Sequence, residues 1–431
     1  MGFSKKTIKD IDIAGKRLLI RVDYSVDVDA HGEIIDDYKI RATLPTIAYA
    51  LENGAAVVLC SHMGRPGGVA RPELSLFPVA KHLRKLLDRD VEFVPECVGD
   101  RAEKAASNCQ PGQVLLLENL RFDSREEAND DSFAGELAHL ADVFVQDGFA
   151  VTYRQHASVE SITHHLQSVA GLLLEREVSE LIDVFADTTT KPLVAVIGGT
   201  SVAEKLHLIE RAIDTADVLV LGGALSTVFL HQMGVKTGKS PLADADIPLV
   251  KQLIDRAREA RASRNFMLVV PQDAVVAMRD DASAPLRIVD WSAHVIADIE
   301  AYPKRPLHES SQVTDEELVL DIGPFTGAFI AGLAQFAGTI LWCGTMGDTL
   351  ITGQRNPIGP FAHGSELVIE SLTGQFGHRP AHTVVAGDDT AQFVLSRGMA
   401  ESFDHVSTGG GASLEILSGR SLVGVDVLEE R

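Results

Sequence analysis

The stretch that decides the fold is residues 193–214, LVAVIGGTSVAEKLHLIERAID. Its first five residues are apolar without interruption, as in a strand buried on both faces of a parallel sheet. Gly198 and Gly199 follow, and then apolar residues recur at helical spacing. The pattern therefore predicts a strand, a glycine turn and a helix. One face of the helix is formed by Val202, Leu206, Ile209 and Ile213.

The same rhythm recurs on both sides of this segment. Short apolar runs separated by helix-like stretches, such as residues 41–53, indicate parallel sheets covered on both faces. We predict an α/β fold with two doubly wound parallel-sheet lobes. The predicted strands of the first lobe are RLLIRV from Arg17, AAVVLC from Ala55, QVLLL from Gln113 and DVFVQ from Asp142. Those of the second are LVAVIGG from Leu193, DVLVLGG from Asp217, FMLVVP from Phe266, LVLDIG from Leu318, TILWCG from Thr339 and TVVAGDD from Thr383.

The length of 431 residues also favours two domains, because one hydrophobic core rarely serves so long a chain. Residues 171–187 carry apolar positions at helical spacing and lead into the polar TTTKP, which is typical of a connecting helix. We expect an N-terminal lobe over 1–170, a connecting helix over 171–187, a C-terminal lobe over 188–405, and a segment over 406–431 that returns toward the N-terminal lobe.

Charge and composition exclude several functions. A net charge of −22 repels phosphate backbones and anionic lipid, so neither nucleic acid nor a membrane is an expected partner. No run reaches the ~20 apolar residues of a spanning helix, and we expect a soluble, cytoplasmic protein. The four cysteines show no CxxC pairing, which argues against zinc sites and disulfide frameworks.

Three loops at predicted strand ends suit phosphate and metal. Gly198 and Gly199 precede a helix, whose free amides and positive end favour an anion, although a tight turn capped by Thr200 or Ser201 fits equally well. STGGGAS (407–413) is a second candidate cradle, with a flexible turn as its alternative. AGDDT (386–390) places Asp388 and Asp389 where magnesium ligands or a solvated turn would lie. GVKTGKS from Gly234 lacks the Walker A spacing.

Basic side chains follow three strands of the first lobe. SHMGRP supplies His62 and Arg65, LENLRF supplies Arg121, and AVTYRQHAS supplies Arg154 and His156. One surface arginine is usually a solvated charge, but several at equivalent strand ends describe a pocket for a small, multiply charged anion. Phosphate in one lobe and an anion in the other suggest a hinge-bending phosphoryl-transfer enzyme, and no GxSxG elbow offers a nucleophile.

These segments together resemble the phosphoglycerate kinase family along nearly the whole chain. The resemblance is carried by RVDYSVDV, IRATLPTI, SHMGRP, LENLRF, DVFVQDGFAVTYRQHAS, AGLLLEREV, VIGGTSVAEK, DIGP, LWCGTMG, AGDDT and STGGGASLE. It implies a glycolytic transferase, commonly monomeric, that uses ATP and Mg²⁺ and reversibly forms an acyl phosphate from 3-phosphoglycerate.

The resemblance also assigns candidate residues. The implied catalytic positions are Lys39, Gly387 and Gly410. The carboxylate substrate would contact Asp23, Ser25, His62, Arg65, Arg121 and Arg154. The nucleotide would contact Gly198, Gly199, Ser201, Lys205, Gly323, Gly409 and Gly411, and the metal would contact Asp389.

Several positions depart from the family pattern. The family has asparagine at Ser25, a catalytic arginine at Lys39 and a phosphoryl-contacting lysine at Ser201. Cys343 and Thr345 replace asparagine and proline, Leu350 replaces a ribose-binding glutamate, and Asp388 replaces glycine. Three hypotheses stay open: a working phosphoglycerate kinase, a divergent paralogue that activates another carboxylate, and a ligand-binding protein without catalysis.

Overall fold

The structure is a computed structural model that describes residues 3–281, 283–291, 312–349, 359–375, 377 and 381–431. These residues form two compact units. The first comprises Met1–Ile182, Thr408–Ile416 and Arg420–Arg431, and the second comprises Asp183–Ser407 and Leu417–Gly419. Each unit contains its own parallel sheet, so the predicted pair of α/β lobes is confirmed.

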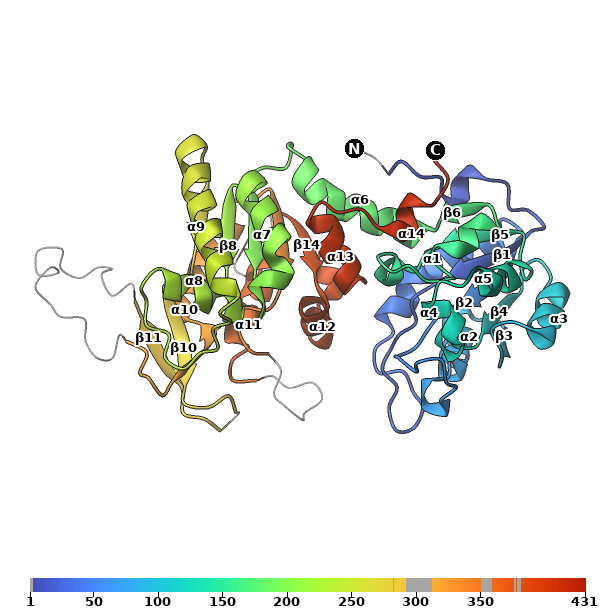
Figure 1. Ribbon diagram of the computed structural model, residues 1–431, viewed down its shortest axis with the longest axis horizontal. Coiled ribbons are helices and arrows are strands. Elements are labelled where there is room, and N and C mark those ends of the chain that lie inside the picture. Colours follow the sequence, from blue (N-terminus) through green and yellow to red (C-terminus); the bar gives the residue numbers. More distant parts are fainter. Residues whose placement is uncertain (1–2, 282, 292–311, 350–358, 376, 378–380) are drawn as a thin grey trace, which may run out of the picture. The chain divides into compact units, whose positions relative to one another are not determined.

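The first unit is built on a six-stranded parallel sheet of order β3-β4-β2-β1-β5-β6. Its register places Leu19 of β1 between Val58 of β2 and Phe144 of β5. The carboxyl ends of four adjacent strands, β4, β2, β1 and β5, therefore meet along one edge (Figure 1). The strands are β1 (Arg17–Arg21), β2 (Ala56–Cys60), β3 (Val91–Val94), β4 (Val114–Leu117), β5 (Val143–Gln146) and β6 (Ser168–Ala170).

Helices cover both faces of this sheet because its strands are apolar on both sides. On one face, buried residues of α1 (Tyr38–Glu52) and α2 (Phe77–Leu87) pack on Leu18 and Ile20. On the other, α3 (Asp100–Asn108) and α5 (Asp131–Ala138) pack around Leu19. The remaining helices with residues in this unit are α4 (Ser124–Glu127), α6 (Leu172–Ala186), α13 (Gly410–Leu417) and α14 (Val423–Asp426).

The second unit has a six-stranded parallel sheet of order β15-β14-β13-β7-β8-β9. Its strands are β7 (Leu193–Ile197), β8 (Val218–Leu221), β9 (Met267–Val269), β13 (Thr339–Cys343), β14 (His382–Ala386) and β15 (His405–Val406). Its helices are α7 (Val202–Thr215), α8 (Gly223–Gln232), α9 (Asp246–Ser263), α10 (Pro324–Ala334), α11 (His363–Leu372) and α12 (Asp388–Ser396). Among the residues described, no helix has the length and apolarity needed to cross a membrane.

One predicted strand belongs to a different sheet. LVLDI, which we assigned to the second parallel sheet, forms β12 (Leu318–Ile322) in a three-stranded antiparallel sheet with β10 (Asp273–Ala277) and β11 (Arg287–Asp290). Only Asp321 and Ile322 of β12 are buried, and its first three residues are half-buried. The assignment was wrong because an apolar run predicts a strand without specifying the direction of its partner.

Candidate functional site

The first unit gathers basic side chains at the carboxyl ends of its strands. His62 follows β2, Arg121 lies in a 3-10 helix (Leu120–Phe122) after β4, and His156 follows β5. Burial lowers the pKa of both histidines, and the charge of Arg121 lowers it further in each case, so the three side chains lie close enough to interact. The structure thus brings together residues that the sequence only placed at equivalent strand ends.

Arg21 is a member of this cluster that the sequence analysis missed. It ends β1, is fully buried, and donates from Nε to Ser158 Oγ at 2.8 Å and from Nη1 to the carbonyl of Val22. Ser158 Oγ donates in turn to the buried carboxyl group of Glu126 at 2.6 Å. A basic residue at the end of the apolar run RLLIR was the available signal, because a charge in that position needs a buried partner.

The imidazole of His62 is uncharged at neutral pH. Burial, together with the charges of Arg21, Arg121 and Lys39, lowers its pKa well below 6.5 despite the nearby Asp23 carboxylate. Its Nδ1 atom lies 3.4 Å from Nη2 of Arg21, which is a donor only. Nδ1 also lies 3.7 Å from Asp23 Oδ1, so the uncharged ring stands between a cation and a carboxylate.

Asp23 and Lys39 form an ion pair next to His62. Lys39 Nζ lies 2.8 Å from Asp23 Oδ2, and the amide of Ser25 donates to Asp23 Oδ1 at 3.0 Å. Burial opposes ionisation of Asp23, but Lys39, His62 and the Ser25 amide together outweigh it, and the pKa of Asp23 falls to about 2. At neutral pH, Asp23 is a carboxylate whose charge Lys39 balances.

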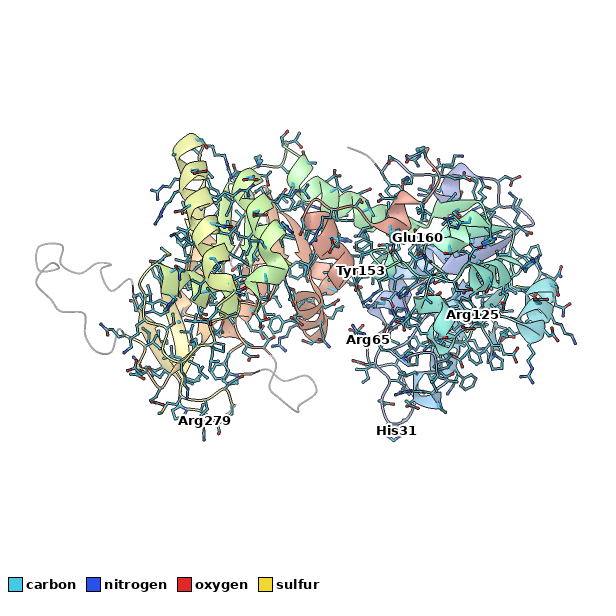
Figure 2. The ribbon with its side chains drawn as sticks, in the orientation of Figure 1. His31, Arg65, Arg125, Tyr153, Glu160 and Arg279 are labelled. Atoms are coloured by element: carbon cyan, nitrogen blue, oxygen red, sulfur yellow. The ribbon has the colours of Figure 1, made fainter. Side chains whose placement is uncertain are left out.

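Of the other predicted substrate residues, Arg65 and Arg154 are accessible and Arg121 is buried. Arg65 is exposed (Figure 2). Arg154 is partly exposed, and its guanidinium carbon lies 4.7 Å from the centre of the Tyr153 ring. Arg121 is 4% exposed and donates from Nη1 to the carbonyl of Gly64 at 2.8 Å. Fixed buried cations beside accessible ones suit an anion that enters from solvent.

In the second unit, Gly198 and Gly199 form the turn between β7 and α7. Gly199 has φ +98°, a conformation that L side chains rarely adopt, and its amide donates to the carbonyl of Thr345 at 2.9 Å. Lys205 Nζ donates to the carbonyls of Gly198 at 2.5 Å and Cys343 at 3.2 Å. Lys205 thus lies directly against the turn and brings a positive charge to it.

Ser201 caps α7. Its Oγ accepts a hydrogen bond from the amide of Glu204 at 3.2 Å. The hydroxyl therefore satisfies one of the free amides at the helix start. A structural role for Ser201 is present whatever the loop binds.

The AGDDT loop places carboxylates at the start of α12. Gly387 precedes the helix with φ +89°, and Asp388 and Asp389 are exposed in its first turn. The described residues contain no group of three or more His, Cys, Asp or Glu side chains that could hold a metal. One exposed carboxylate is enough for a magnesium ion that takes its other ligands from phosphate and water, and Asp389 is the residue that would supply it.

Gly323 precedes α10 and packs against Asp273. A Cβ atom at Gly323 would lie 2.2 Å from the Asp273 carboxyl group, and the Gly323 amide donates to the Asp273 carbonyl at 3.0 Å. The same carboxyl group accepts from the amides of Phe325 and Thr326, both at 2.8 Å. Asp273 therefore already satisfies two amides at the start of α10.

The triple-glycine loop packs within the first unit. A Cβ atom at Gly409 would lie 2.6 Å from the Phe149 ring, and one at Gly411 would lie 3.0 Å from the Tyr153 ring. Just before the loop, the amide and hydroxyl of Thr408 both donate to the buried Glu177 at 2.6 Å. Gly410 is the first residue of α13. Close packing explains the absence of side chains at Gly409 and Gly411 without reference to a ligand.

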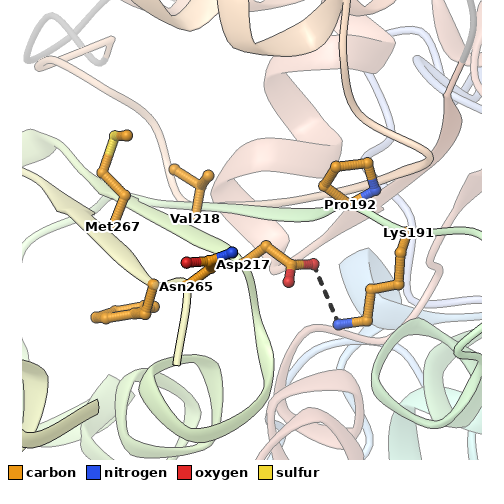
Figure 3. A pocket seen from close by; sticks show the side chains of 7 residues that line it. Lys191, Pro192, Asp217, Val218, Asn265 and Met267 are labelled. Carbon is orange, nitrogen blue, oxygen red and sulfur yellow. Dashed lines mark ion pairs between the residues drawn. The ribbon is translucent and has the colours of Figure 1, made fainter. Parts of the chain in front are cut away.

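A cavity of about 570 Å³ lies at the opposite edge of the second sheet (Figure 3). Its lining residues lie at the amino ends of strands β7, β8 and β9. Among them, Lys191 Nζ lies 3.2 Å from Asp217 Oδ2. Ligands of open α/β sheets bind at the carboxyl ends of strands, so this cavity is not the predicted nucleotide site. Leu350, the remaining departure noted in the sequence, lies outside the described residues.

The fold and these loops define a class: a two-lobed α/β protein with a buried cation cluster in one lobe and glycine turns at helix starts in the other. The phosphoglycerate kinase family model matches residues 8–420. The chain therefore belongs to the phosphoglycerate kinase family.

Individual relatives cover the chain from end to end. It is 41% identical to the phosphoglycerate kinase of Moorella thermoacetica over 428 residues, covering 99% of this chain and 100% of that one. It is also 41% identical to that of Chloroflexus aurantiacus over 429 residues, with 99% of both chains covered. Among solved structures, phosphoglycerate kinase from Coxiella burnetii superposes with a TM-score of 0.79 at 31% identity, and that from Pyrococcus horikoshii with 0.76 at 25%, each covering 98% of both chains.

Proposed function

We propose that the chain catalyses reversible phosphoryl transfer between ATP and the carboxylate of 3-phosphoglycerate. The observation that carries the proposal is the burial of two arginines, Arg21 and Arg121, beside His62 in a chain of net charge −22. Buried guanidinium groups are costly without anions, and the pKa of Arg121 is lowered by burial. Glu126 and the ion pair of Arg121 with Glu127, at 3.3 Å, offset part of this cost, and a multiply charged substrate would offset more.

In the first unit, the protein's residues would bind and orient the phosphoglycerate. Arg121 and Arg21 are fixed by hydrogen bonds to Gly64 and Ser158, so their positions are set before a ligand arrives. His62 would contact the substrate as an uncharged ring, and Arg65 and Arg154 would supply charge from the accessible side. Such preorganisation lowers the entropic cost of binding.

In the second unit, the glycine turn and Lys205 would hold the nucleotide phosphates. Gly198 and Gly199 permit close approach to the backbone, and the α7 amide end favours negative charge. Asp389 would supply a carboxylate ligand to Mg²⁺, which neutralises charge on the phosphate oxygens when bound. The residues themselves position and balance charge, which is most of what phosphoryl transfer requires.

Lys39 and Ser201 are the two departures from the family pattern that would lie nearest the transferring phosphoryl group. Lys39 forms an ion pair with Asp23, and Ser201 caps the start of α7. Lysine lacks the bidentate fork of arginine, so we expect weaker stabilisation of the transferring group. The predicted hinge closure, cytoplasmic location and monomeric state stay predictions.

The test is hydroxamate trapping of the acyl phosphate that purified protein forms from 3-phosphoglycerate, ATP and Mg²⁺. Expression in a host lacking its own phosphoglycerate kinase removes contaminating activity, and Arg121→Gln serves as the matched inactive control. Turnover that Arg121→Gln abolishes supports the proposal. Turnover only with another carboxylate would establish the divergent paralogue. ATP and phosphoglycerate binding without turnover of any carboxylate tested would establish the non-catalytic alternative.

A further inference from the structure

Asp321 is a buried carboxyl group that the proposed chemistry does not use. It lies on β12, is 3% exposed, and accepts hydrogen bonds from the amides of Ile322 and Gly364, both at 2.8 Å. Within the described residues no basic side chain lies within ion-pair distance of it. Burial raises the pKa of Asp321 to about 8, although the surrounding amides oppose this, so the group is largely uncharged at pH 7.

Two glycines from other segments leave room for this carboxyl group. A Cβ atom at Gly347 would lie 2.3 Å from Asp321 Oδ1, and one at Gly364 would lie 2.4 Å from the same atom. Real Cβ atoms do not approach so closely. The loop 344–348 and the start of α11 are therefore both packed directly onto Asp321.

The loop 344–348 also supports the glycine turns of the candidate nucleotide site. The carbonyl of Thr345 accepts from the Gly199 amide at 2.9 Å, and the carbonyl of Met346 accepts from the Gly223 amide at 2.8 Å. On its other side, the Met346 amide donates to Ser365 Oγ at 2.9 Å. A shift of this loop must move the two glycine turns or break their hydrogen bonds.

We propose that Asp321 is a positioning residue that fixes the loop 344–348 and, through it, the turns at Gly199 and Gly223. The carboxyl group hydrogen-bonds the start of α11 to β12, and Gly347 of the loop packs directly against it. This inference rests on the proposed function only in taking those turns as the nucleotide site. The position of the turns themselves can be measured without any nucleotide.

The decisive variant is Asp321→Asn. Both carboxyl oxygens accept from backbone amides, whereas asparagine places an NH₂ group against one of them, so a buried hydrogen bond is lost without a change of charge at pH 7. Leu253→Ala, a buried α9 position outside the loop's hydrogen bonds, is the control for general loss of stability.

Two readouts separate positioning from stability. Hydrogen exchange in the full chain without ligand should be about tenfold faster at Gly199 and Gly223 in Asp321→Asn than in Leu253→Ala. Calorimetry should show ADP binding about tenfold weaker, with 3-phosphoglycerate binding unchanged. Should Asp321→Asn not fold, Ser365→Ala removes the hydrogen bond to Met346 and should give the same pattern at smaller size.

Equal exchange rates at Gly199 and Gly223 in Asp321→Asn and Leu253→Ala would overturn the positioning role. If the wild type binds no ADP but Asp321→Asn still shows the faster exchange, the proposed function is wrong and the positioning role stands.

Discussion

The ammonium nitrogen of Lys39 lies 2.8 Å from the carboxylate of Asp23. Lys39 stands where the family has a catalytic arginine, and Asp23 is a predicted substrate-binding residue. Asp23 is 7% exposed and keeps a pKa of about 2 because Lys39 compensates for its burial. The pair therefore links acid stability to the candidate site.

Lys39→Met should lower the free energy of unfolding at pH 7 by about 2 kcal/mol, because Lys39 is the largest of the interactions that hold the pKa of Asp23 at about 2. A depressed carboxyl pKa stabilises the fold above the unfolded value near 4, and this contribution is lost as pH falls toward 2. The difference between variant and wild type should therefore vanish near pH 2, as measured by denaturant unfolding at several pH values. The exposed Lys85→Met, which pairs with Glu33 at 3.5 Å, is the control, and the idea fails if the two variants behave alike.

Glu126→Gln should destabilise the first unit and make its stability depend on the concentration of added anion. Burial raises the pKa of Glu126, but Arg21 opposes this, and Glu126 lies near both Arg21 and Arg121. Its replacement leaves Arg121 only the ion pair with Glu127 at 3.3 Å, at a cost of roughly 3 kcal/mol. Sulfate should then stabilise the variant more than the wild type in thermal unfolding. Glu136→Gln removes a partly exposed partner of Arg125 and should show neither effect. Equal stabilisation by sulfate in Glu126→Gln and wild type would contradict the charge-balancing role.

Ser201→Lys should lower the free energy of unfolding and raise the rate of turnover. Losing the α7 cap costs about 1 kcal/mol, and Ser201→Ala should show the same loss. If the new lysine contacts the transferring phosphoryl group, turnover with 3-phosphoglycerate should rise by up to about 10²-fold, whereas Ser201→Ala should gain nothing. Steady-state kinetics on both variants decide this, and no gain in Ser201→Lys would favour a different carboxylate substrate.

Asp147→Asn should stabilise the protein at alkaline pH. Asp147 is fully buried and accepts at Oδ1 from the amides of Leu173 at 3.0 Å and Leu174 at 3.2 Å. Burial raises its pKa to about 7, so the wild type is most stable when this carboxyl is protonated and loses stability as pH rises from about 4 through 7. The variant should exceed the wild type at pH 8 by up to roughly 4 kcal/mol and match it near pH 4. Parallel stability curves across this range would refute the assignment.

The two-lobed α/β fold could be predicted from local sequence pattern alone. Continuous apolar runs such as residues 193–197 have to be buried on both faces, and the glycine turn and helix that follow each depend only on local geometry. Because parallel strands end at one edge, sequence position was also enough to group His62, Arg121 and Arg154. The resemblance added the family, which the comparisons confirm.

Only the tertiary structure decided which charges balance one another. Arg21 and Glu126 are 105 positions apart in the chain (126 − 21), and their link through Ser158 exists only because β1, α4 and the segment after β5 converge. The local sequence pattern likewise did not predict the antiparallel partner of β12 or the packing of Gly409 on Phe149. Secondary structure follows from short-range periodicity, whereas pKa values, buried ion pairs and strand partners depend on contacts between distant segments.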